Sequence, residues 1–163
     1  MKDRTCCFTG HRRIPAEKAE EIRVKLKHTI IKAVEEGYLY FGAGGALGFD
    51  TLATLTVLEL KEKYPSIRLI LVLPCVNQTR GWNKKDVEVY EYIKSKCDKY
   101  VYTSKEYTNG CMQKRNRHLV DNSSLCICYL TEDKGGTAYT VNYAKQKGLK
   151  MINMAEIKEP TLM

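Results

Sequence analysis

The sequence of 163 residues lacks the features that mark membrane, secreted and repetitive proteins. No run approaches the roughly 18 consecutive apolar residues that are needed to span a bilayer, so we expect no membrane segment. The apolar stretch near the first residue is too short for a secretory signal peptide, which favours a cytoplasmic location. Linkers, repeats and low-complexity segments are also absent, and we therefore expect a single domain over residues 1–163.

Metal-ligand spacing is also missing, because none of the seven cysteines forms a CxxC pair. Cys6, Cys7, Cys126 and Cys128 lie in apolar runs that are typical of strands, where a free cysteine behaves as a small hydrophobic residue. A zinc site made by Cys126 and Cys128 with Cys6 or Cys7 is an alternative. A reducing compartment favours free thiols in the core, and we expect neither disulfides nor a metal site.

Acidic residues are scarce relative to basic ones: 19 Asp and Glu stand against 27 Lys and Arg, which gives a formal net charge of +8. Such an excess fits a nucleic acid, a membrane surface or a small anionic ligand as partner. The lysines are scattered over expected helix faces, and no five basic residues follow one another. We therefore interpret the charge as a local phosphate site on an otherwise ordinary basic surface.

Apolar runs rich in β-branched residues alternate with helical patterns along the whole chain. We predict strands at residues 5–9, 38–41, 68–73, 99–103, 125–130 and 149–153, and helices at residues 15–36, 50–63, 84–95, 112–121 and 137–147. The strand at 68–73 has no polar alternation, as expected at the centre of a parallel sheet. This order predicts an α/β fold: a doubly wound, mostly parallel sheet of about six strands with helices on both faces.

In such a sheet, right-handed crossovers place the strand-to-helix loops along one edge, where ligands bind. Three loops at this edge are rich in glycine: one holds Gly10, His11 and Arg12, one holds Gly44, Gly45, Ala46, Gly48 and Asp50, and one holds Gly135, Gly136 and Thr137. Backbone amides that glycine leaves accessible at a helix N-terminus can bind phosphate. The alternative for each loop is an ordinary turn, with Asp50 and Thr137 as helix N-caps.

Two other segments extend this predicted edge. Gln78 and Trp82 follow the strand at 68–73, and the single tryptophan either stacks on a base or packs its loop down. Arg115 and Asn116 lie at the start of the helix at 112–121, where they could bind phosphate and ribose or base. His11 has no adjacent Ser or Cys nucleophile, so the sequence indicates no catalytic triad.

Taken in order along the chain, these motifs resemble the YpsA-like family of the SLOG superfamily. The resemblance rests on residues 9–12, residues 44–50, Pro74 with Gln78 and Trp82, Arg115-Asn116 before Val120-Asp121, and residues 135–137 with Thr140. It spans residues 5–153 and extends to the lysine-decarboxylase-like LOG proteins and to the Rossmann-like domain of the DNA-processing protein DprA. It implies a Rossmann-like fold that binds a nucleotide or nucleotide-derived ligand, with NAD and ADP-ribose as leading candidates.

The chain differs from the LOG proteins in one residue that their catalytic activity needs. LOG enzymes hydrolyse the N-glycosidic bond of nucleoside 5′-monophosphates with an Arg, which Arg115 resembles, and a Glu, whose place Thr140 takes. Because such cleavage generally needs a carboxylate, we expect a domain that binds or senses its ligand rather than an enzyme. The alternatives are an N-glycosidase with Asp50 and Arg115 as catalytic residues, and a nucleic-acid-binding module like DprA. The kinship also allows a homodimer.

In the leading hypothesis, glycine amides hold the phosphates of a small-molecule nucleotide ligand, Asp50 accepts hydrogen bonds from ribose hydroxyls, and a base lies near Trp82. The full set of predicted ligand-binding residues is Gly10, His11, Arg12, Gly44, Gly45, Ala46, Gly48, Asp50, Gln78, Trp82, Arg115, Asn116, Gly135, Gly136, Thr137 and Thr140.

Overall fold

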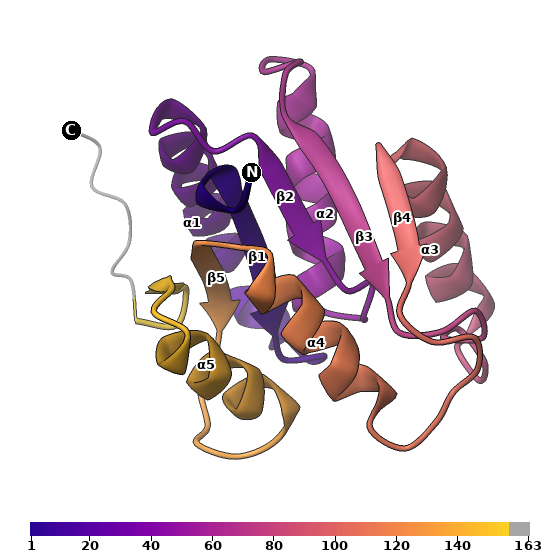
Figure 1. The fold of residues 1–163 in the computed structure, drawn as a ribbon. Coiled ribbons are helices and arrows are strands. Elements are labelled where there is room, and N and C mark those ends of the chain that lie inside the picture. The colour runs from indigo at the N-terminus through magenta and orange to yellow at the C-terminus, as the bar shows by residue number, and fades with distance from the viewer. Residues whose placement is uncertain (157–163) are drawn as a thin grey trace.

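A computed structural model describes residues 1–156, which form one sheet with helices on both of its faces (Figure 1). The strands are β1 (Thr5–Gly10), β2 (Tyr40–Ala43), β3 (Arg68–Leu73), β4 (Lys99–Tyr102), β5 (Leu125–Tyr129) and β6 (Lys150–Asn153). A short 3-10 turn, η1 (Lys2–Arg4), precedes the helices α1 (Ala16–Glu35), α2 (Phe49–Lys61), α3 (Lys84–Lys96), α4 (Cys111–Asp121) and α5 (Gly136–Gln146). Neighbouring strands are all parallel, and the predicted α/β fold class is confirmed.

The strand order β4-β3-β2-β1-β5-β6 places a change of direction beside β1. The chain moves outward from β1 to β4, and α4 then returns it to β5 on the other side of β1. In Figure 1, α1, α2 and α3 accordingly lie on one face of the sheet, and α4 and α5 lie on the other. A doubly wound sheet binds ligands in the crevice at the carboxyl ends of the strands beside this point.

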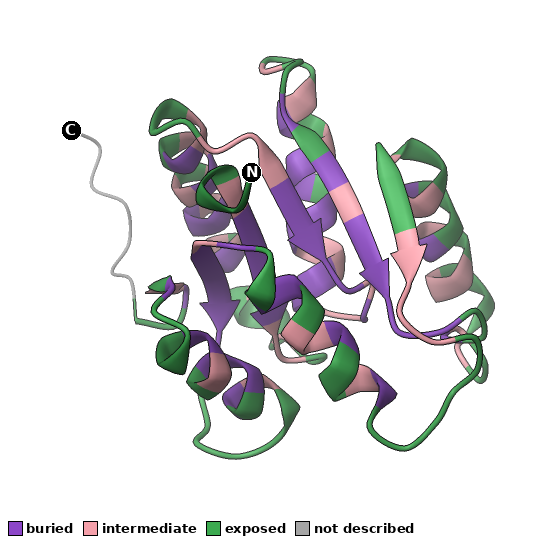
Figure 2. Cartoon of the chain, in the orientation of Figure 1, coloured by how far each residue is buried: buried purple, intermediate pink, exposed green. Residues whose placement is uncertain are grey.

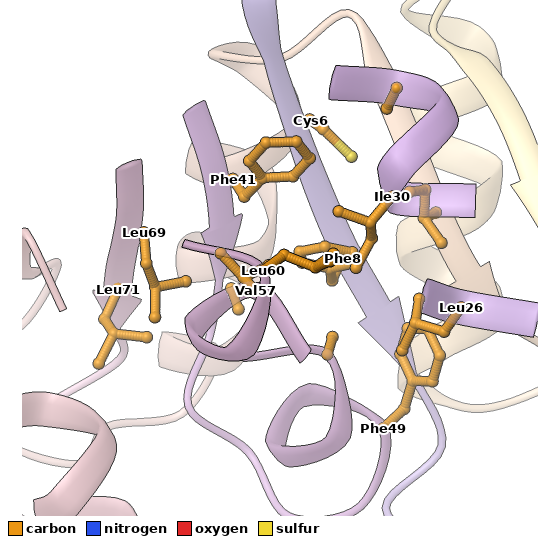
Figure 3. Packing of buried hydrophobic residues seen from close by; sticks show 14 of the residues in the cluster. Cys6, Phe8, Leu26, Ile30, Phe41, Phe49, Val57, Leu60, Leu69 and Leu71 are labelled. Carbon is orange, nitrogen blue, oxygen red and sulfur yellow. The ribbon is translucent and has the colours of Figure 1, made fainter. Parts of the chain in front are cut away.

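The helix spacing read from the sequence matches the buried face of α1. Ile22, Leu26, Ile30 and Ala33 recur at three- and four-residue intervals and are all buried against the sheet. The core on this face centres on Phe8, whose ring stacks on that of Phe41 at a centroid distance of 6.2 Å (Figure 3). Figure 2 shows β5 buried along its whole length. This is expected for an apolar strand that has a neighbouring strand on each side and helices over the sheet.

Six of the seven cysteines are buried, and Cys97 is half-buried. All seven are free, and Cys7 and Cys126 are register partners on the adjacent strands β1 and β5. Within residues 1–156, no three His, Cys, Asp or Glu side chains are grouped so that they could hold a metal ion. None of the helices in that range is long and apolar enough to cross a bilayer.

Candidate functional site

A cavity of about 780 Å³ opens at the carboxyl ends of the strands. Its volume lies in the range of small-molecule sites, roughly 300–1,000 Å³. The loops after β1, β2, β3, β4 and β5 all contribute to its wall, as does the start of α4. The lining residues are Thr9, Gly10, His11, Arg12, Ala46, Asp50, Asn77, Gln78, Arg80, Trp82, Tyr107, Met112, Arg115, Asn116, Glu132, Lys134, Gly135, Gly136 and Thr137.

Most of the predicted ligand-binding residues therefore lie around one cavity. Those outside its wall are Gly44, Gly45, Gly48 and Thr140. Thr140 is buried in α5, where its hydroxyl donates a hydrogen bond to the Gly136 carbonyl at 3.0 Å. The structure thus brings together segments from across the sequence at the expected edge, and direct contact with a ligand stays a prediction for each residue.

The glycines of the β2–α2 loop make room for neighbouring groups. A Cβ on Gly44 would collide with the guanidinium of Arg115, and a Cβ on Gly48 would collide with the backbone carbonyl of Arg12. Gly48 also has a φ of +78°, in the left-handed region that favours glycine. These contacts pack the loop against the β1–α1 loop and α4, and Ala46 is the residue that reaches the cavity.

The helix ends at the cavity lack side-chain caps. Gly48 is the N-cap of α2 and Gly135, with a φ of +96°, is the N-cap of α5. The alternative in which Asp50 and Thr137 are the N-caps is therefore wrong. Because neither glycine offers a side-chain acceptor, the first amides of α5 lie at the cavity wall without a capping oxygen.

Arg115 is a buried cation on the cavity wall, with 5% of its surface exposed. Its Nη1 donates to the Gly44 carbonyl, its Nε donates to Oδ1 of Asn116 at 2.7 Å, and its Nη2 lies 3.6 Å from Sδ of Met112. None of these three partners is an anion. Burial lowers the pKa of Arg115, while the nearby Asp50 acts in the opposite direction. A buried guanidinium with neutral partners is well placed to bind an anion.

Two acceptors near Arg115 are also incompletely satisfied. Oδ2 of Asp50 accepts a hydrogen bond from the Ala46 amide at 3.2 Å, while Oδ1 is buried without a protein partner. Gln78 donates from Nε2 to the Gly44 carbonyl at 3.2 Å, and its Oε1 is likewise buried without a protein partner. Burial raises the pKa of Asp50, although the positive charge of Arg115 and the hydrogen bond from the Ala46 amide both act to lower it. Both residues line the cavity, although these two oxygens are themselves covered by protein atoms.

We predict that Asp50→Asn raises the melting temperature at pH 7. The Asp50 pKa is higher in the folded than in the unfolded protein, so its contribution to stability falls as pH rises from about 4 through the folded-state pKa. The neutral asparagine side chain removes the cost of burying a charge. The increase in melting temperature over the wild type should therefore shrink as the pH falls toward 4, where Asp50 itself becomes neutral. Thermal melts between pH 4 and 8 measure the difference in melting temperature between the variant and the wild type.

Asp98 offers a control of opposite sign. Partial burial acts to raise its pKa, but hydrogen bonds from Lys61 and from the Leu69 amide prevail and lower it. Asp98→Asn should therefore lower the melting temperature at pH 7, and the loss should fade in acid. A D50N protein that is less stable than the wild type at pH 7, or a gap that does not change with pH, would show that the Asp50 charge is not destabilising.

His11 links two walls of the cavity. The Thr131 amide donates to Nε2 of His11 at 2.9 Å, and the His11 amide donates to the Tyr129 carbonyl at 3.3 Å. The imidazole also lies edge-on to the Tyr129 ring at a centroid distance of 5.7 Å. His11 thus joins the β1–α1 loop to the β5–α5 loop, which carries Gly135.

Sequence patterns did not single out Tyr107, Met112 or Glu132, which also line the cavity. Each lies on a loop after a strand or in the first turn of a helix, so position at the sheet edge was the signal that could have found them. Trp82 lies at the cavity wall, with its ring packed edge-on against Tyr90 at 5.6 Å and 88°.

Comparisons with known proteins agree with this architecture. A family model named YpsA, with the description YspA SLOG family, matches residues 7–159. A UPF0398 protein of Bacillus thuringiensis (strain Al Hakam) is 30% identical over 132 residues, which cover 79% of this chain and 72% of that protein.

Solved structures of DNA processing protein A (DprA) share the fold. The protein from Streptococcus pneumoniae matches with a TM-score of 0.69 and 17% identity over 99% of this chain and 52% of that one. The protein from Helicobacter pylori, whose structure addresses single-stranded DNA binding, matches with a TM-score of 0.66 and 19% identity over 91% of this chain and 64% of that one. This chain therefore spans about half to two thirds of the length of these DprA chains.

Proposed function

Because the chain belongs to the YspA SLOG family, as its sequence motifs indicated, we propose that the cavity binds a nucleotide or nucleotide-derived small molecule. The observation that carries the proposal is Arg115, a guanidinium with 5% exposure whose hydrogen-bond partners are all neutral. A buried cation of this kind gains most from a phosphate or carboxylate brought by a ligand. The proposed role is binding or sensing.

The surroundings of Arg115 support an anionic ligand. The uncapped N-terminus of α5 presents Gly135 and Gly136 to the cavity, and the partial positive charge of a helix N-terminus favours phosphate. Arg12 and Lys134 line the same side and add positive charge. The proposed phosphate subsite therefore lies beside the carboxyl ends of β1 and β5.

The free acceptors favour a ribose-containing ligand over inorganic phosphate alone. Oδ1 of Asp50 and Oε1 of Gln78 are buried without protein partners, and leaving such groups unsatisfied costs about 1–3 kcal/mol each. A sugar with two adjacent hydroxyls offers donors to both once these side chains turn toward the cavity. A cavity of about 780 Å³ also suits one small molecule better than a polymer, although the DprA proteins make single-stranded nucleic acid the second candidate.

We expect ADP-ribose, NAD or a related nucleotide to raise the melting temperature. A ligand at 100 times its dissociation constant stabilises by about 2.7 kcal/mol, which corresponds to roughly 5–10 °C in a domain of this length. The single tryptophan, Trp82, lines the cavity and gives a second readout, since its fluorescence should change on binding. A panel of nucleotides and phosphosugars at millimolar concentration is the measurement.

The controls separate the candidate functions. Binding of a single-stranded oligonucleotide with a steep salt dependence, and no response to small nucleotides, would favour the nucleic-acid alternative. Chromatography of the same mixtures for free base detects N-glycosidic hydrolysis, the activity that Asp50 and Arg115 on one cavity would support. A flat response of both melting temperature and Trp82 fluorescence across the panel would contradict the proposal.

A further inference from the structure

Tyr107 is an exposed aromatic side chain at the mouth of the cavity. It lies in the β4–α4 loop, lines the cavity, and keeps 63% of its surface exposed. An aromatic ring with free surface can stack on a planar group of a ligand. Tyr92, Tyr100 and Tyr139 are exposed as well, so it is the combination of exposure with a place on the cavity wall that distinguishes Tyr107.

The backbone under Tyr107 is held in place while its ring stays free. The Tyr107 amide donates to Oδ1 of Asn77 at 3.2 Å, and the Val76 amide donates to the Lys105 carbonyl at 3.3 Å. These bonds tie the β4–α4 loop to the β3–α3 loop, which carries Gln78 on the same cavity. A ring presented on an anchored loop loses little further freedom when it contacts a ligand.

Trp82, the aromatic residue that the sequence singled out, is placed differently. Its ring lies edge-on to Tyr90 and packs against the hydrophobic core with Tyr90 and Val89. Trp82 thus holds its loop against α3, which is the second of the two roles considered for it. Tyr107 is the cavity-lining aromatic residue with the larger free surface.

The two ends of the cavity differ in chemistry. The end beside β5 carries Gly135, Gly136 and Lys134, whereas the end beside β3 and β4 carries Tyr107 and the aromatic Trp82. Four strand spacings separate β4 from β5, about 19 Å. A ligand that reaches both ends would therefore place its phosphates far from the group that meets Tyr107.

Building on the proposed function, we infer that Tyr107 is the platform on which a planar aromatic group of the ligand, such as a nucleobase, stacks. The phosphates then lie between Arg115 and the N-terminus of α5, and the Asp50 and Gln78 side chains beside Arg115 meet the sugar. Tyr107 sets specificity for a base-containing ligand and does not contribute to phosphate binding.

The test compares ADP-ribose, which carries a base, with ribose 5-phosphate, which carries none. Calorimetric titration measures ADP-ribose directly and ribose 5-phosphate as its competitor, on the wild type, Tyr107→Ala and Tyr107→Phe. Tyr107→Ala should weaken ADP-ribose binding roughly 5- to 150-fold, the range for loss of one stacked base, and leave ribose 5-phosphate unchanged. Tyr107→Phe keeps the ring and should bind both as the wild type does.

Tyr92→Ala is the matched control, because Tyr92 is 52% exposed on α3 and does not line the cavity. It should bind both compounds as the wild type does. Unchanged ADP-ribose affinity in Tyr107→Ala, or an equal loss for both compounds, would overturn the assignment while leaving the proposed function intact. Failure of these two compounds and of every nucleotide in the panel to bind the wild type would overturn the proposed function, and this inference with it.

Discussion

Gly48→Ala should lower the free energy of unfolding by about 2–5 kcal/mol. The left-handed φ of +78° costs an L side chain roughly 1–2 kcal/mol. The new Cβ would also meet the backbone carbonyls of Arg12 and His11, which cannot rotate away as a side chain would. Forcing extra volume into a packed site adds about 1–3 kcal/mol. Denaturant unfolding followed by circular dichroism measures the loss.

Gly37→Ala isolates the backbone contribution. Gly37 has a φ of +104°, but nothing lies within 4 Å of the Cβ that alanine would add. Its substitution should cost only the conformational strain, about 1–2 kcal/mol. Equal losses in the two variants would mean that the β1–α1 and β2–α2 loops can move apart, and the tight contact between them would then not matter for stability.

Arg115→Met should weaken ADP-ribose binding by about 2–5 kcal/mol, the range for removing one partner of a buried charge-assisted contact. The change deletes the buried cation but keeps much of the apolar side chain. The Gly44 carbonyl would still accept a hydrogen bond from Gln78, so the loop around it should stay folded. Calorimetric titration gives the affinity, and circular dichroism verifies the fold.

Arg117→Met is the control on the same helix. Arg117 donates to the Tyr139 hydroxyl at 3.1 Å and does not line the cavity, so its loss should leave affinity unchanged. Like Arg115→Met, this variant removes one positive charge from the protein. The comparison therefore separates the contact made by Arg115 from the effect of the overall net charge on affinity. If Arg115→Met folds and binds ADP-ribose as tightly as the wild type, the buried guanidinium is not the anion site.

The fold could be predicted because each strand and helix has a hydrophobic pattern that can be recognised within its own short segment of sequence. The unbroken apolar run of β3 and the three- and four-residue spacing in α1 each report burial directly. The parallel sheet then follows from the alternation of strands and helices, and the position of the cavity follows from the sheet. Arg12, Asp50 and Arg115 were brought to one place by topology alone.

The functions of individual glycines could not be predicted in this way. The sequence motif at 44–48 suggested amides open to phosphate, whereas Gly44 and Gly48 make room for Arg115 and for the Arg12 carbonyl. Those neighbours are distant in sequence, and one sequence does not say which groups will approach a glycine. Tyr107 was missed for a related reason, since its exposure depends on how its loop is tied to Asn77.

The central position of β1 also governs the order in which the chain can fold. β1 is made first, yet one of its two neighbours is β5, whose residues follow more than a hundred positions later: Cys6 pairs with Leu125. Contacts between such distant residues close slowly, because a long loop of chain must be ordered before they form. During synthesis, β1 to β4 can assemble while one edge of β1 stays unpaired. The cavity, whose wall includes the loop after β5, is therefore complete only after this late pairing.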